Sequence, residues 1–132
     1  MAGERLLVIH DYPGTRTWLV DLLTTSGYQT RGVPDLAAAC LAYQRQRPDV
    51  VILLLTGNEA ARLQLVQALR TTPETRQSRC LMLVEGAVSP RLRRQAQGLD
   101  TIVPVDLASA QVHQMVQAGL ERTLGHWLVG RG

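Results

Sequence analysis

The fold is first visible in residues 6–30, which read LLVIHDYPGTRTWLVDLLTTSGYQT. The apolar run at residues 6–9 has the length of a strand, and apolar residues between positions 18 and 23 then recur at helical spacing. Gly27 follows the last of them, which is typical of a helix end. Residues 28–33 predict a second, more polar strand, which we expect at an edge of the sheet. The segment therefore predicts strand, helix, strand.

The same alternation continues along the chain. Strand-length apolar runs recur at residues 50–55, 80–84 and 101–105, and continuous rather than alternating runs are typical of strands covered on both faces. Helices are predicted between them, with Asp35, Asn58 and the pair Ser89 and Pro90 at their starts and a last helix from about Ala108. The predicted fold class is α/β, a doubly wound five-stranded parallel sheet with helices on both faces.

Length and composition predict one domain. The chain has 132 residues, enough to bury a core without disulfides or metal. We assign residues 1–124 to the domain and 125–132 to a C-terminal tail or the start of a linker, although Trp127 and Leu128 continue the apolar register of the last helix. No stretch approaches the roughly 18 apolar residues of a membrane span, so we expect a cytoplasmic protein.

The charge of the chain excludes some functions. All 14 basic residues are arginine, so chemistry that needs a lysine amine is excluded. The net charge of +3 is a mild excess, and aromatic residues make up only 4% of the chain, which disfavours the stacking platforms of single-stranded nucleic-acid binders. We expect no membrane partner, and no nucleic acid for this domain alone.

Two segments carry a family resemblance. Residues 6–30, quoted above, and PDVVILLL at residues 48–55 resemble the receiver domain of bacterial two-component response regulators, and the likeness extends over about residues 5–123. The resemblance implies the flavodoxin-like (CheY-like) fold with strand order 2-1-3-4-5. It also implies a phosphorylation site: an acidic pair after the first strand, a phosphoacceptor Asp ending the third, a Ser or Thr ending the fourth and a Lys-Pro ending the fifth.

The residues at these positions do not match the family's chemistry. The acidic pair falls on His10 and Asp11, the phosphoacceptor on Leu54, the hydroxyl on Val84 and the lysine on Val105 or Pro104. An isobutyl group has no oxygen that could form an acyl phosphate. The chain thus resembles a degenerate receiver, or pseudo-receiver, whose altered phosphorylation pocket comprises His10, Asp11, Leu54, Thr56, Val84, Glu85 and Val105. We expect no catalytic residue, no metal ion and no cofactor there.

A surface is predicted to take over the function. In receivers, the fourth helix, fifth strand and fifth helix commonly serve dimerisation or partner docking, and the family's aromatic switch position falls near Ile102. The candidate interaction face comprises Arg91, Arg94, Ile102, Gln111, Gln114 and Met115. Gln111, Gln114 and Gln117 are expected at outward positions of the last helix. Their neutral amides carry little desolvation penalty, which suits burial in a protein contact. The expected partner is another protein or a second copy of the chain.

We therefore predict a signalling domain that interacts with proteins independently of phosphorylation. One alternative is a small-molecule or pH sensor that uses the remade pocket near His10, Asp11 and Glu85. Another is the regulatory domain of a DNA-binding response regulator. Acid–base cooperation between His10 and Asp11 is not expected, because adjacent strand residues point to opposite faces unless the strand has already ended.

Overall fold

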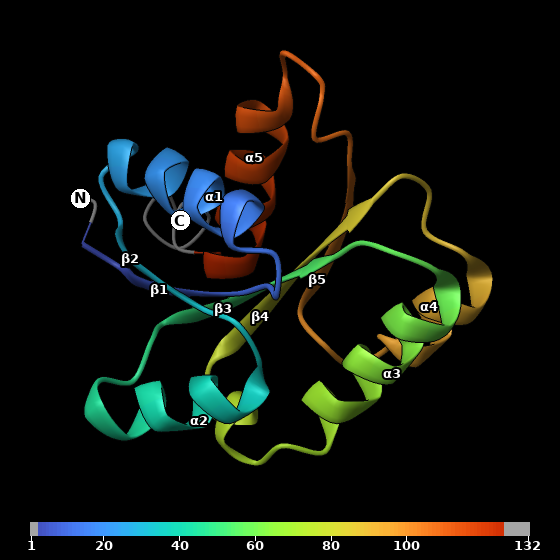
Figure 1. Ribbon diagram of the computed structural model, residues 1–132, viewed down its shortest axis with the longest axis horizontal. Helices are drawn as coiled ribbons and strands as arrows, with labels where there is room; N and C mark the ends of the chain where they lie inside the picture. Colours follow the sequence, from blue (N-terminus) through green and yellow to red (C-terminus); the bar gives the residue numbers. More distant parts are fainter. Residues whose placement is uncertain (1–2, 126–132) are drawn as a thin grey trace.

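The computed structural model describes residues 3–125, in which strands and helices alternate along the chain (Figure 1). A short 3-10 helix, η1, is the one addition to the regular alternation of this part of the chain. The elements are β1 (Arg5–Ile9), α1 (Pro13–Thr25), β2 (Gln29–Val33), α2 (Leu36–Arg45), β3 (Val50–Leu55), α3 (Glu59–Arg70), η1 (Glu74–Gln77), β4 (Arg79–Glu85), α4 (Pro90–Gln95), β5 (Thr101–Val105) and α5 (Val112–Leu124).

The five strands form one parallel sheet with the order β2-β1-β3-β4-β5, which confirms the predicted fold class. The polar strand β2 lies at one edge, as expected, and β5 lies at the other. Helices α1 and α5 cover one face, and α2, α3 and α4 cover the other (Figure 1).

Each face of the sheet has its own apolar core. In β3, Val50, Ile52 and Leu54 belong to the core under α1 and α5, whereas the alternate residues of the strand belong to the core under α2, α3 and α4. All six residues of β3 are buried. A strand buried on both faces cannot alternate apolar and polar residues, which is why the continuous apolar run predicted this architecture.

Three predicted helix starts are confirmed by their side chains. Asp35 accepts a hydrogen bond from the Ala38 amide at 2.8 Å, and Asn58 accepts one from Ala61 at 2.8 Å. The Ser89 hydroxyl accepts one from the Leu92 amide at 3.1 Å. Each bond satisfies a backbone donor that the first turn of a helix leaves free.

The last helix begins later than the sequence predicts, at Val112 instead of about Ala108. Two polar side chains hold the preceding residues in turns. The Asp106 carboxylate accepts from the Ala108 amide, and the Ser109 hydroxyl accepts from the Gln111 amide, both at 3.0 Å. Such local bonds compete with the helix for backbone donors, so the helix starts after them.

Helix α5 ends at Leu124, and Gly125 takes the left-handed conformation with φ 64°. Trp127 and Leu128, with the rest of the predicted tail beyond Gly125, lie outside the described residues. Between residues 3 and 125, none of the helices combines the length and the apolar character that crossing a bilayer requires.

Helix α5 approaches the sheet closely at Gly119, which predicts an effect of substitution there. A Cβ atom at Gly119 would lie 3.2 Å from Leu81 Cδ1 and 3.2 Å from Val103 Cγ2. Gly119→Val should overpack this contact and lower the free energy of unfolding by about 1–3 kcal/mol, measured by urea denaturation. Ala118→Val, at an exposed position of the same helix, is the control. Equal stability of the two variants would contradict the close packing.

Candidate functional site

The residues predicted to form the pocket lie at or near the carboxyl ends of the strands. Ile9, the last residue of β1, lies beside Leu53 of β3, and Val84 of β4 lies beside Leu55. Glu85 lies beside Val105 of β5. Parallel strands bring their carboxyl ends to one edge of the sheet, so the structure places the predicted site where ligands bind in open α/β sheets.

The apolar side chains of this site are closed off from solvent. Leu54 is 1% exposed, and Val84 and Val105 are also buried. They do not form one cluster, however: Leu54 and Val105 belong to the core under α1 and α5, whereas Val84 belongs to the opposite core. A ligand could touch these side chains only after the cores had repacked, which is unfavourable to the small-molecule alternative.

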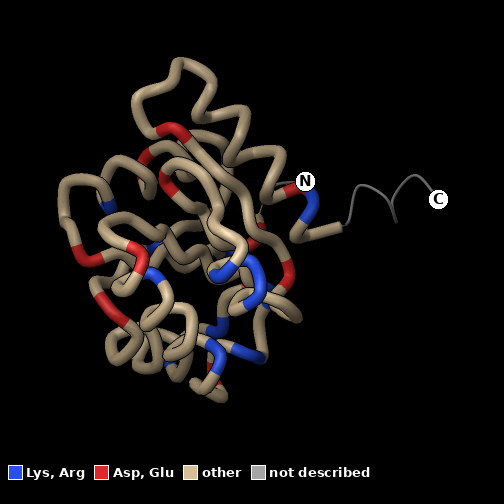
Figure 2. Tube along the Cα trace, turned by 90° about the vertical axis from the view of Figure 1, so that its right-hand side faces the viewer, with Lys and Arg blue, Asp and Glu red and all other residues tan. Residues whose placement is uncertain are grey.

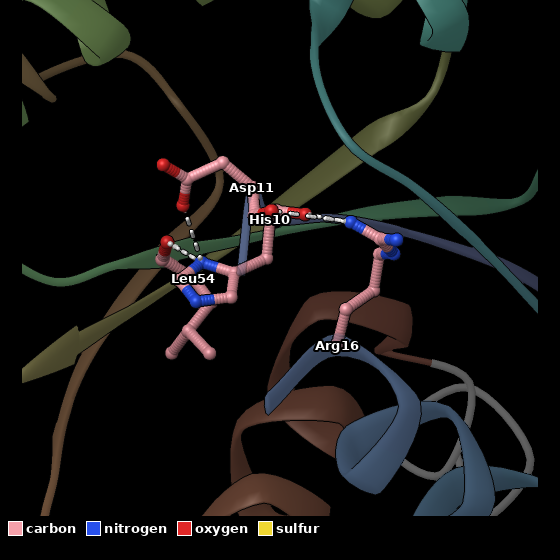
Figure 3. A network of polar contacts seen from close by, with 4 residues as sticks. All are labelled: His10, Asp11, Arg16 and Leu54. Atoms are coloured by element: carbon pink, nitrogen blue, oxygen red, sulfur yellow. Dashed lines mark hydrogen bonds and ion pairs between the residues drawn. The ribbon is translucent and has the colours of Figure 1, made fainter. Parts of the chain in front are cut away.

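His10 covers the end of β3. Its side chain is 4% exposed, and its Nδ1 atom lies 3.1 Å from the carbonyl oxygen of Leu54 (Figure 3). Because a carbonyl oxygen only accepts, the hydrogen bond requires Nδ1 to carry the proton. The His10 amide also donates to the Val33 carbonyl at 3.1 Å, which fixes the backbone of this residue against β2. The imidazole is thus buried and held in place at the carboxyl end of β3, and we call this arrangement the His10 plug.

Asp11 is adjacent to His10 but faces solvent. Its Oδ1 atom lies 3.8 Å from His10 Nδ1, and its side chain is 90% exposed. β1 ends at Ile9, so the exception stated for the strand alternation applies, and the two side chains approach each other. The contact is an ion pair only when the imidazole is protonated, and solvent around the exposed Asp11 carboxylate weakens it.

Arg16 completes the site and was missed by the sequence analysis. Its guanidinium donates to the His10 carbonyl at 2.7 Å and, more weakly, to the Asp11 carbonyl at 3.5 Å (Figure 3). It lies in the first turn of α1, where a helix leaves backbone amides unpaired and favours an anion. The sequence did contain a signal for this residue, namely a basic side chain near the start of a helix, five positions after Asp11.

The remaining site residues lie apart from this network. Thr56 follows β3 and is half-buried, and Glu85 is exposed at the end of β4. Asp11 and Glu85 offer carboxylates, but over residues 3–125 no three His, Cys, Asp or Glu side chains are grouped so that they could hold a metal ion. The side chains of His10 and Arg16 therefore bond backbone carbonyls and cover the carboxyl ends of the central strands.

The candidate interaction face is divided between two surfaces. Arg91 and Arg94 are exposed on α4, where they line a groove together with α3. Ile102 packs partly into the core under α2, α3 and α4, and Met115 packs partly into the opposite core. Gln111 and Gln114 are exposed at the start of α5.

The orientation expected for Gln117 is wrong. Its Nε2 atom donates to the Tyr28 hydroxyl at 2.9 Å, and its side-chain oxygen is buried. The amide therefore connects α5 to the start of β2 instead of facing outward. Helical spacing alone could not show this, because the contact depends on a residue 89 positions away in the sequence.

Comparison with known structures identifies the fold. The chain matches CheY4 of Vibrio cholerae with a TM-score of 0.71 and 20% identity, over 93% of this chain and 100% of that one. The fold is that of CheY-like receiver domains. A receiver domain of a histidine kinase from Syntrophus aciditrophicus matches with a TM-score of 0.68, 22% identity and coverage of 93% and 91%. A response regulator described as putative, from Chloroflexus aurantiacus, matches with a TM-score of 0.68 and 19% identity, over 93% of this chain and 98% of that one. No protein-family model and no curated protein sequence matches the chain.

The His10 plug predicts a measurable contribution to stability of this receiver fold. His10→Leu removes the hydrogen bond to the buried Leu54 carbonyl, so the free energy of unfolding should fall by about 1–3 kcal/mol in urea denaturation. His113→Leu is the matched control, because His113 is exposed and bonds only the Ser26 side chain, at 2.8 Å. If both variants lost the same amount, the buried bond would carry no special weight.

Proposed function

We propose that this domain acts in two-component signalling without accepting a phosphoryl group and works by docking onto other proteins. The observation that carries the proposal is Leu54. The resemblance assigns the phosphoacceptor to this position, and here an alkyl side chain, 1% exposed, lies beneath a histidine that bonds its carbonyl. The site has neither the nucleophile nor the access that phosphorylation needs.

The other positions of the proposed pseudo-receiver support the same interpretation. Val84 has no hydroxyl to bind a phosphoryl oxygen, and Val105 has no amine. A magnesium ion is usually held through one or two carboxylates together with phosphate and water. Asp11 is the surviving carboxylate of the pair, it faces solvent, and the Arg16 guanidinium lies over its backbone carbonyl. We assign the domain no catalytic role and no cofactor.

The proposed activity is docking onto a partner in the cytoplasm. In receivers, phosphorylation shifts a population between two surface conformations, and a site that cannot be phosphorylated leaves that population unshifted. Binding would then depend on the abundance of the domain and of its partner. The exposed residues available for it on α4 and α5 include Arg91, Arg94, Gln111 and Gln114.

Beryllofluoride with Mg²⁺ tests the loss of phosphorylation directly. This mimic of a phosphoryl group needs the phosphoacceptor carboxylate and the metal, so backbone amide spectra of the protein should not change when both are added. Acetyl phosphate should likewise add no phosphoryl mass. A receiver with its aspartate intact serves as positive control. Saturable shifts around Asp11 and Leu54, or a phosphoryl adduct, would refute the proposal.

Restoring the carboxylate should harm the protein instead of repairing it. Leu54→Asp would bury a charge without a lysine or a metal beside it, and an uncompensated buried charge costs about 3–5 kcal/mol of stability. Burial raises the pKa of such a carboxyl, so the loss should be larger at neutral pH than at acidic pH, where the group is neutral in both states.

Leu54→Met, which keeps an apolar side chain of similar volume, should lose less than about 1.5 kcal/mol and is the control. Chemical denaturation at two pH values measures all three proteins. A Leu54→Asp variant as stable as the parent at neutral pH would show that the site still accommodates an ionised carboxylate.

A further inference from the structure

The groove between α3 and α4 shares Arg91 and Arg94 with the predicted interaction face, and its other lining residues were not part of that face. It is open to solvent and encloses about 580 Å³. Leu63 and Ala68 give it apolar contact area, Gln67 and Gln95 contribute amides, and Arg91 and Arg94 contribute guanidinium groups. Residues three apart on a helix lie on one face. Arg91 and Arg94 share such a face, and both line the groove together with residues of α3.

Side-chain bonds near both ends of the groove hold the two helices together. The Ser89 hydroxyl donates to the Glu59 carboxylate at 2.5 Å, which joins the beginnings of α4 and α3. The Arg70 guanidinium donates to the Gln95 carbonyl at 3.2 Å, which joins their ends. Gln95 also donates to the Gln67 side chain. The groove is therefore already formed before a ligand binds, so binding costs little free energy for ordering the two helices.

The groove is basic, because its lining includes two arginines and no carboxylate. Helices α3 and α4 together carry five arginines and one carboxylate, Glu59, which is engaged by Ser89. Within residues 3–125 the one ion pair closer than 4 Å is His10 with Asp11, so Arg91 and Arg94 face no carboxylate at that range. Figure 2 looks at the side of the molecule that carries these helices and shows basic positions, with acidic ones among them, in its middle and lower parts.

The chemistry of the groove selects its occupant. Unpaired guanidinium groups bind carboxylates in two-pronged fashion, and apolar area between them suits aliphatic side chains. No aromatic residue lines the groove, so bases would find no stacking surface. A second copy of the chain offers no acidic segment, because its 11 acidic residues lie at least six positions apart in the sequence.

We infer that the α3–α4 groove binds an acidic amphipathic segment of a partner protein, with carboxylates on Arg91 and Arg94 and aliphatic side chains on Leu63 and Ala68. The inference rests on the proposed docking function and names the chemistry of the partner. It places the contact on the α3 side of α4, away from β5 and α5.

A designed peptide tests this surface. The probe is a fluorescein-labelled 18-residue helix of Glu, Leu and Ala, with Glu three and four positions apart, and the control probe has Gln in place of every Glu. Fluorescence anisotropy with the full chain should show binding of the acidic helix that weakens with salt, and amide shifts should map to α3 and α4. Failure of the acidic helix to bind overturns the inference.

Charge reversal at neighbouring positions separates the groove from general attraction. Arg94→Glu should weaken binding at least about tenfold, because Arg94 lines the groove. Arg93→Glu makes the same charge change on the same helix, at an exposed residue outside the lining, and should weaken binding less than about threefold. Equal weakening by the two variants would reduce the attraction to net charge and overturn the groove assignment.

Two further measurements test whether nucleic acid or a second copy of the chain occupies the groove instead. Tighter binding of an 18-nucleotide poly-dT or of duplex DNA, lost in Arg94→Glu, would make the groove a nucleic-acid site. A dimer in sedimentation analysis that Arg94→Glu dissociates would make it a self-contact. Beryllofluoride is independent of all these outcomes, so failure of the groove and failure of the proposed signalling mechanism are distinguishable.

Discussion

The structure depends on the burial of β3 on both of its faces. Six consecutive apolar side chains in the middle of the sheet, all inaccessible to water, need a layer of helices above and another below. The right-handed crossovers between parallel strands supply both layers. The helices then differ in what they cover: α1 and α5 close one core, and α2, α3 and α4 close the other.

That constraint also explains the character of the candidate site. Open α/β sheets usually become polar at the carboxyl ends of their strands, where ligands bind. Here the apolar cores continue to the ends of β3 and β4, through Leu54, Leu55 and Val84, all nearly inaccessible. His10 adds a buried polar group at this edge, and it bonds a carbonyl of the sheet itself. A polar network missing several members is less stable than an apolar packing, so the apolar side chains at these positions support one another.

Local signals made most of the fold predictable from the sequence. The four apolar runs, the polar edge strand and the caps at Asp35, Asn58 and Ser89 depend on neighbours a few residues away, and the structure confirms them. The start of α5 was placed too early because apolar periodicity does not register a competing turn at Asp106 and Ser109.

The site was less predictable, because its contacts are long-range. The sequence identified which residues meet at the sheet edge, but not that His10 turns inward to the Leu54 carbonyl, 44 positions away. Arg16 and Gln117 were missed or misplaced for the same reason. The groove of Arg91 and Arg94 depends on where α3 lies, which no pattern within α4 encodes.

Arginine as the sole basic residue has a structural consequence beyond the missing lysine amine. Several guanidinium groups bond main-chain carbonyls in loops and at helix ends, where an arginine can satisfy more than one acceptor. These are Arg16, Arg47, Arg62, Arg70 and Arg79. The hydrogen bonds of these five side chains stabilise the fold, whereas Arg91 and Arg94 are exposed and line a groove. The net charge of +3 sums the acidic and basic residues of the whole chain, so it does not show that α3 and α4 carry five arginines and one carboxylate.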